Sequence, residues 1–210
     1  MRSLPQPMPR LSFEGFSLLP PQGDHWCVID LNQKVGVVFG TTPLIGQVLT
    51  RQPTEEELDD ILVAVANKVE IERDPGTSAE VRDFVDSWLR SGQPSHVDAG
   101  KRILARSSTE AARFNLVDSS VVIDDSIGSS CIRFDATVEE RNNPRWPGEV
   151  LVSVERGNLL CRSPRTGDPS FVWIGASERY RQSRPPHPLL SETRAPEIEA
   201  FTRSLSFTQP

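Results

Sequence analysis

Four segments rich in β-branched and aromatic residues follow one another in the second half of the chain, with no helical pattern between them. They span residues 114–123, 130–139, 150–156 and 171–180, each bounded by Gly, Pro, Asn or Asp. Successive strands joined without a crossover helix pair antiparallel, because a turn reverses the direction of the chain. The sequence therefore predicts an antiparallel meander rather than a Rossmann-like α/β sheet.

A helix is predicted from about Thr77 to Arg90. Thr77 and Glu80 have the spacing of a capping box, which satisfies two backbone amides at the start of a helix. Five apolar residues then recur at helical spacing on one face: Val81, Phe84, Val85, Trp88 and Leu89. We expect this face to pack on the sheet, with Phe84 and Trp88 buried.

Further strands and a second helix complete the expected layout. Residues 13–19 and 26–39 predict two or three short antiparallel strands. Both the odd and the even positions of residues 61–66 are apolar, which suits a strand covered on both faces. Capping-box spacing at Thr54 and Glu57 makes a helix the alternative. A helix that begins at Pro196 carries the apolar stripe Ile198, Phe201 and Leu205. The expected fold class is α+β, an antiparallel sheet of six or more strands with two main helices packed on it.

The chain of 210 residues suits one domain, which we place at residues 11–208. Residues 1–10 contain Pro5, Pro7 and Pro9 and no apolar signal core, so they are expected to form a flexible tether. Either the protein is cytoplasmic, or a signal is missing from the start and the protein is extracytoplasmic, in the periplasm or anchored to a membrane. No apolar run approaches the roughly 20 residues of a membrane span.

The sequence lacks the common catalytic motifs and predicts no cofactor. It contains no phosphate-binding glycine loop, nucleophile elbow, H-E-x-x-H or C-x-x-C. His25, His96 and His187 have no neighbours at metal-ligand spacing, so no metal site and no catalytic residue is predicted. Adjacent acids such as Glu139 and Glu140 point to opposite faces of a strand and rarely converge on one substrate. The net charge of −6 disfavours a nucleic-acid partner.

Cys131 and Cys161 are predicted to face each other across a long hairpin. The segment 142–148 is full of turn formers, and the two cysteines are symmetric about Trp146. Directly opposed residues of two antiparallel strands are close enough for a disulfide. Such a bond would indicate an oxidising compartment, whereas two buried thiols in a cytosolic core remain the alternative. Cys27 stays unpaired in both cases.

The turn of this hairpin is the predicted binding surface. Asn143, Arg145 and Trp146 lie among prolines, and an aromatic ring and an arginine held by a stiff turn lose little entropy on docking. The alternative is that Trp146 folds back onto the core, since tryptophan is usually largely buried.

Several segments resemble an uncharacterised group of bacterial exported, lipoprotein-like proteins. They are residues 13–21 (FEGFSLLPP), 23–28 (GDHWCV), 131–135 (CIRFD), 157–162 (GNLLCR) and 177–180 (SERY). The opening segment, the helix in mid-chain and the meander are also similar to the PsbP-like fold, whose members dock on larger assemblies and lack catalytic centres. The chain departs from both by having no lipid-accepting cysteine near Met1 and no recognisable calcium or manganese site.

The sequence and the resemblance together predict a non-catalytic accessory protein that docks on a larger protein assembly or envelope component. Peripheral association with a membrane through a missing N-terminus stays open. Two alternatives also remain: a hydrolase or isomerase with a nonstandard site around His25 and Asp24, and a cytosolic scaffold that binds a protein partner.

Overall fold

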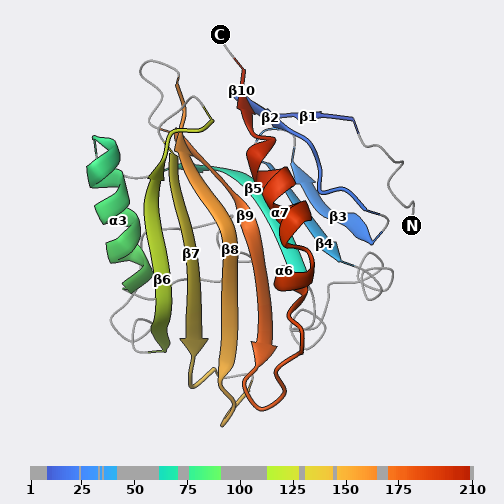
Figure 1. The fold of residues 1–210 in the computed structure, drawn as a ribbon, viewed down its shortest axis with the longest axis vertical. Coiled ribbons are helices and arrows are strands. Elements are labelled where there is room, and N and C mark those ends of the chain that lie inside the picture. Colours follow the sequence, from blue (N-terminus) through green and yellow to red (C-terminus); the bar gives the residue numbers. More distant parts are fainter. Residues whose placement is uncertain are drawn as a thin grey trace.

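The computed structural model describes residues 9–23, 25–32, 34, 36–41, 62–70, 76–90, 113–127, 131–143, 146–164 and 170–208. The centre of the fold is one antiparallel sheet of seven strands in the order β3-β4-β5-β9-β8-β7-β6. Figure 1 shows its long strands side by side, with β6 at one edge and β3 at the other. The α+β class and the sheet of six or more strands are therefore confirmed.

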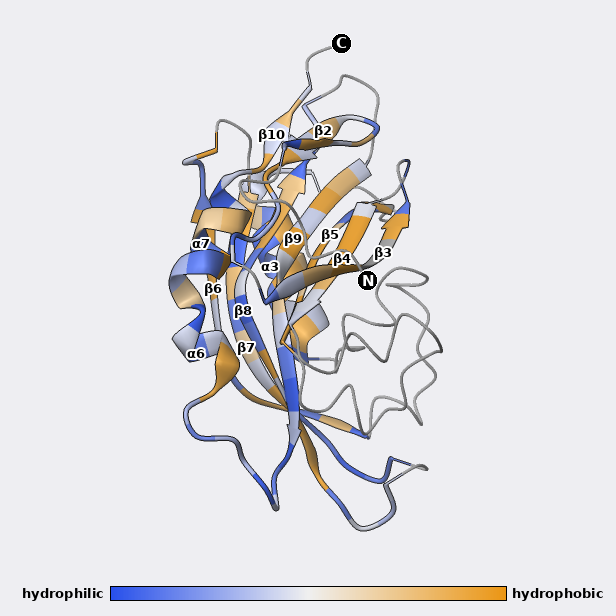
Figure 2. Cartoon of the chain, turned by 90° about the vertical axis from the view of Figure 1, so that its right-hand side faces the viewer, coloured by the Kyte–Doolittle hydropathy of each residue, from blue (hydrophilic) through white to orange (hydrophobic). Residues whose placement is uncertain are grey.

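The four predicted strands of the meander are all present and are longer than the sequence pattern indicated. They are β6 (Phe114–Asp124), β7 (Cys131–Glu140), β8 (Leu151–Arg162) and β9 (Ser170–Arg181). The remaining strands of the large sheet are β3 (Trp26–Asn32), β4 (Gly36–Thr41) and β5 (Leu62–Glu70). β5 lies between β4 and β9 and is buried on both faces, so the strand interpretation of residues 61–66 is confirmed. Figure 2 shows long hydrophobic stretches on β4 and β9.

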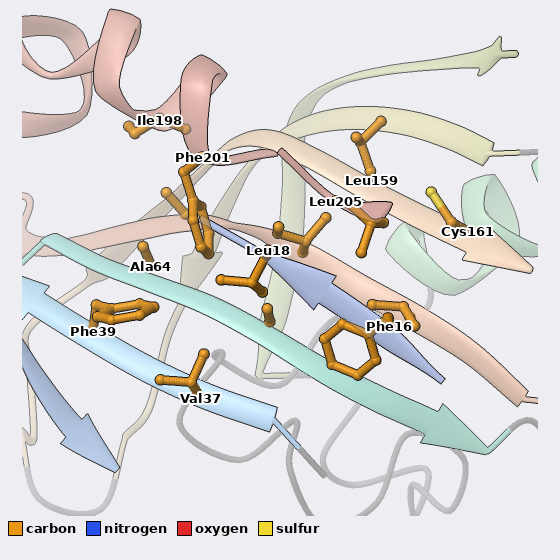
Figure 3. Packing of buried hydrophobic residues seen from close by; sticks show 14 of the residues in the cluster. Phe16, Leu18, Val37, Phe39, Ala64, Leu159, Cys161, Ile198, Phe201 and Leu205 are labelled. Atoms are coloured by element: carbon orange, nitrogen blue, oxygen red, sulfur yellow. The ribbon is translucent and has the colours of Figure 1, made fainter. Parts of the chain in front are cut away.

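One face of the sheet is covered by the C-terminal helix α7 (Ala195–Arg203), which follows the short helix α6 (Leu190–Thr193). As predicted, Ile198 and Phe201 of α7 are buried, and so is Leu205, which follows the end of the helix. Figure 3 shows Phe201 pointing from α7 toward Phe39 on β4, and their ring centroids lie 5.8 Å apart in an edge-to-face arrangement. The apolar stripe of α7 is thus one wall of the larger hydrophobic core.

Helix α3 (Ser78–Arg90) packs on β6 and β7. Its residues belong to a second core cluster that includes Phe171 and Trp173, whereas Val172 and Ile174 of the same strand belong to the first. Alternate residues of a strand point to opposite faces, so the two helices cover opposite faces of the sheet. The predicted capping box is confirmed, because the Glu80 amide donates to Thr77 Oγ1 at 3.3 Å and the Thr77 amide donates to Glu80 Oε2 at 2.7 Å.

The burial of Phe84 and Trp88 on α3 is less complete than the sequence predicted. Val81, Val85 and Leu89 are buried, but Phe84 and Trp88 are only partly buried. The sheet lies nearest to the line of Val81, Val85 and Leu89, so the two aromatic residues flank the contact. Trp88 packs edge-to-face on Trp173, with the ring centroids 5.3 Å apart.

β8 contains an irregularity that the sequence pattern did not predict. Near Gly157 its register shifts by one residue against both β7 and β9. Gly157 has φ of 60°, a left-handed conformation that favours glycine, and its amide donates to Asp135 Oδ1 at 2.6 Å. The next residue, Asn158, is fully buried and accepts a hydrogen bond from Trp173 Nε1 at 2.8 Å.

The two ends of the described chain meet in a second, small sheet. It has the order β1-β2-β10, with β1 at Leu11–Ser12, β2 at Phe16–Leu18 and β10 at Ser206–Phe207. Arg10 adds a hydrogen bond from Nη1 to the Ser204 carbonyl at 2.8 Å. Residues 1–8 of the predicted tether lie outside the described residues.

Candidate functional site

The predicted disulfide is present. Cys131 and Cys161 are direct partners in the pairing of β7 with β8, and their sulfur atoms are bonded. Both cysteines are buried in the larger core cluster, where Figure 3 shows Cys161 beside Leu159. Cys27 is the remaining cysteine and is a buried free thiol.

A buried charged cluster lies at the end of the sheet where the β7–β8 hairpin turns. Glu140 is buried on β7 and binds two guanidinium groups, those of Arg113 and Arg179, the latter at 2.6 Å. Asn143 is buried as well and donates from Nδ2 to Glu140 Oε1 at 3.0 Å. Asn143 is therefore placed as an internal support of the turn. Glu139, which precedes Glu140 on β7, points to the opposite face of the sheet and binds Arg141.

Trp146 is half-buried at the same turn. The guanidinium carbon of Arg181 lies 4.6 Å from the centre of its ring, which is a cation–π contact between the turn and the end of β9. The Trp146 Nε1 atom is buried and has no hydrogen-bond partner among the described residues. One face of the Trp146 ring is thus covered by Arg181. Arg145, the other charged residue of the predicted binding surface, lies outside the described residues.

His25 contacts a carboxylate of the C-terminal helix rather than standing alone in a loop. Its Nε2 lies 2.8 Å from Glu197 Oε2 on α7, and Trp26 Nε1 donates to the same oxygen at 2.7 Å. Burial opposes the ionisation of Glu197, but hydrogen bonds from Trp26, His25 and Arg194 outweigh it and lower the pKa of Glu197 below its usual value. This cluster ties the start of β3 to the C-terminal helix. Asp24 and His96 lie outside the described residues, and His187 is exposed.

The edge strand β6 carries the most exposed apolar residues of the described chain. Five large hydrophobic side chains are exposed among the described residues, and three of them lie on β6: Val117 at 54%, Val122 at 47% and Ile123 at 42%. Val117 is the extra residue of a bulge, since the pairing with β7 shifts between Leu116 and Asp118. From Asp118 to Asp124 the pairing with β7 is regular.

The far end of β6 is closed by a turn with a strongly acidic carboxyl. The Ser126 amide donates to Asp124 Oδ1 at 2.9 Å, and Arg133 binds Asp124 Oδ2 at 2.7 Å. The hydrogen bonds from Ser126 and the contact with Arg133 lower the pKa of Asp124 from 3.8 to about 2. Burial acts in the opposite direction but is outweighed. Asp125, next along the chain, is exposed.

Sequence reasoning missed both the exposed residues of β6 and the His25–Glu197 pair. The consecutive Val121, Val122 and Ile123 look like a strand buried on both faces, and nothing local marks them as an edge. The partner of His25 is 172 residues away, so no spacing motif connects the two.

Comparisons with known proteins add little to this description. No protein-family model matches the sequence, and no curated protein matches it. Among solved structures, the fold is similar to LpqN of Mycobacterium tuberculosis, described as involved in cell envelope biogenesis. The TM-score is 0.41 and the identity 14%, over 92% of this chain and 83% of that one. A similarity this weak carries no argument about function, and the resemblance to PsbP-like, lipoprotein-like proteins stays a prediction.

Within the described part of the chain, no helix is long and apolar enough to cross a membrane. Among the same residues, no three His, Cys, Asp or Glu side chains gather in a way that would hold a metal ion.

Proposed function

We propose that the protein is a non-catalytic accessory protein that docks on a protein partner through β6. The observation that carries this proposal is the gathering of Val117, Val122 and Ile123 on one edge strand. Exposed large apolar side chains are usually scattered singly over a protein, whereas these three share one edge strand, and Val122 and Ile123 are adjacent on it. Polar residues of the same strand, among them the exposed Asp118 and Ser120, would form the rim that such interfaces have.

The disulfide supports an extracytoplasmic place for this interaction. Cys131 and Cys161 are bonded, and disulfides persist in oxidising compartments outside the cytosol. The partner would then be an envelope component or a larger assembly exposed to the same compartment.

The turn predicted from the sequence, with Asn143, Arg145 and Trp146, is proposed as a second contact. Its support is the Trp146 ring, which is half-buried and stacked under Arg181 in a chain that is acidic overall. Asn143 would act there by holding the turn, because its amide is buried against Glu140.

Site-specific photo-crosslinking tests the docking surface. A photoreactive residue at Val122 is compared with one at Leu31, which lies on the opposite edge strand and is equally exposed, at 47%. We expect Val122 to form an adduct with a discrete partner in intact cells, whereas Leu31 forms none.

The partner identified in this way is then purified and titrated against variants. Val122→Ser with Ile123→Ser should weaken its binding by about 2 kcal/mol, the cost of removing a central apolar contact, and Leu31→Ser should not. Equal binding by all three proteins would reject docking through β6.

A further inference from the structure

We infer that β6 binds its partner by strand addition, and that the partner segment is apolar in its centre and basic at both ends. The residues concerned, Asp118–Asp124, are called the β6 edge below. This inference rests on the proposed docking function and specifies the chemistry of the partner that the surface selects.

The backbone of the β6 edge is suited to accept another strand. Among the described residues, β6 pairs with β7 on one side and is the last strand of the sheet in that direction. In an antiparallel pair, alternate residues point their N–H and C=O groups away from the partner strand, so an edge strand offers a row of donors and acceptors. Seven consecutive residues, Asp118 to Asp124, pair with β7 without a register shift and therefore present this row regularly.

The side chains of the β6 edge favour an apolar segment. Val122 and Ile123 are adjacent, so they lie on opposite faces of the sheet, and both are more than two-fifths exposed. A strand added beside them would bring its own side chains to within about 4.5 to 5.5 Å on both faces. Burial of these two residues therefore requires apolar side chains at the centre of the partner segment.

The charges at the two ends select basic residues. Asp118 at one end and Asp125, just beyond the other, are exposed carboxylates. Asp124 differs from them, because Arg133 and Ser126 already bind its oxygens. A segment with Lys or Arg at each end would meet a carboxylate at each end, whichever direction it runs.

The same charges disfavour a second copy of this chain as the occupant. Antiparallel self-pairing centred on Val121 would place Asp118 opposite Asp124 of the second copy, at both ends. A shift of one residue would place Asp118 opposite Asp125. Like charges directly opposite each other destabilise a strand pair. They therefore disfavour pairing between the β6 edges of two copies, whereas a basic segment meets no such repulsion.

Binding of two labelled peptides to the full chain tests the inference. Each peptide alternates threonine and valine, and one has a lysine at each end where the other has a glutamate. We expect the lysine peptide to bind about tenfold more tightly, since two attractive pairs replace two repulsive ones. Replacement of its central valine by proline should abolish binding, because proline removes a backbone donor.

A charge reversal locates the contact. Asp118→Lys with Asp125→Lys should invert the order of the two peptides, whereas Glu199→Lys, an exposed reversal on α7, should leave it unchanged. Absence of binding by the lysine peptide, equal affinities, or an order that survives the double reversal would each overturn strand addition. If any of these results occurs while Val122→Ser with Ile123→Ser still weakens binding of the purified partner, strand addition is rejected and docking through β6 stands. If that double variant also binds the partner as the wild type does, docking through β6 is rejected as well.

Discussion

The three cysteines occupy chemically distinct positions, and their reactivity should follow. Burial raises the pKa of the Cys27 thiol to about 11, and its sulfur donates to the Gly40 carbonyl at 3.7 Å. We therefore expect no reaction of the native protein with a thiol reagent at neutral pH, because the thiolate is both rare and inaccessible. After denaturation without reductant, thiol counting should find one group, Cys27. Three groups would contradict the disulfide.

Asp124 should make the stability of the protein depend on pH in the acidic range. Its pKa is about 2 in the folded state, against 3.8 as the ordinary value. A carboxyl with a lowered folded pKa stabilises the protein above the unfolded pKa, and this contribution is lost as the pH falls through the folded value. The difference corresponds to about 2 kcal/mol.

Asp124→Asn provides the comparison for this prediction. The free energy of unfolding of the wild type should exceed that of the variant by about 2 kcal/mol more at about pH 6 than at about pH 2. The asparagine oxygen can still accept the hydrogen bond from the Ser126 amide, so the turn itself should persist. Parallel pH profiles of the two proteins would show that Asp124 does not carry the effect.

Substitutions in α3 test which of its residues hold it on the sheet. Leu89 is fully buried, and Phe84 is partly buried. Leu89→Ala should lower the free energy of unfolding by about 2 to 5 kcal/mol, the range for a buried leucine. Phe84→Ala, although it removes the larger side chain, should cost less because part of its ring is already in contact with water. Urea unfolding of both variants decides this, and a larger loss for Phe84→Ala would show that the helix packs by its aromatic flank.

The β7–β8 hairpin shows what the sequence could and could not predict at this scale. The turn formers at residues 142–148 and the symmetry of the two cysteines about Trp146 predicted the pairing of Cys131 with Cys161. Near the turn, however, Glu140 pairs with Leu151, and the one-residue register shift at Gly157 brings the two cysteines opposite each other. The bulge at Gly157 was not predictable, because the glycine has no local signal that separates a bulge from an ordinary strand residue. Residues 13–19 were predicted as a strand and contain β2, but β1 and β10, its partners in the small sheet, were missed because strands of two residues are too short to show a period.

The turn and β6 are separate surfaces, and variants of each distinguish which of them the partner contacts. Arg145→Ala with Trp146→Ala should weaken binding of the purified partner by at least about 2 kcal/mol if the turn is an anchor. The variant should also lose about 1 kcal/mol of stability, because the Trp146 ring no longer packs against Arg181. Arg181→Ala is the matched control, since it breaks the same cation–π contact and keeps the ring.

The comparison of these variants separates the two surfaces. Loss of binding by the turn variant but not by Arg181→Ala supports the turn. Wild-type binding by both, together with weak binding by Val122→Ser and Ile123→Ser, assigns docking to β6 alone. Neither surface was fully predictable from the sequence, because the position of β6 at the edge and the position of Arg181 over Trp146 depend on how distant segments of the chain meet.

The bond between Cys131 and Cys161 also determines which segments of the chain carry a mechanical force applied to its two ends. A pull on the two ends of the chain passes through the sulfur atoms and leaves the hairpin between them without load. The cysteines are 30 residues apart, so about 100 Å of extended chain is withheld from stretching. The turn around Trp146 lies inside this unloaded loop, whereas β6 precedes Cys131 and lies in the loaded part. A partner held at the turn would therefore remain on an unstressed segment while the rest of the chain is drawn out, and a partner held at β6 would be released.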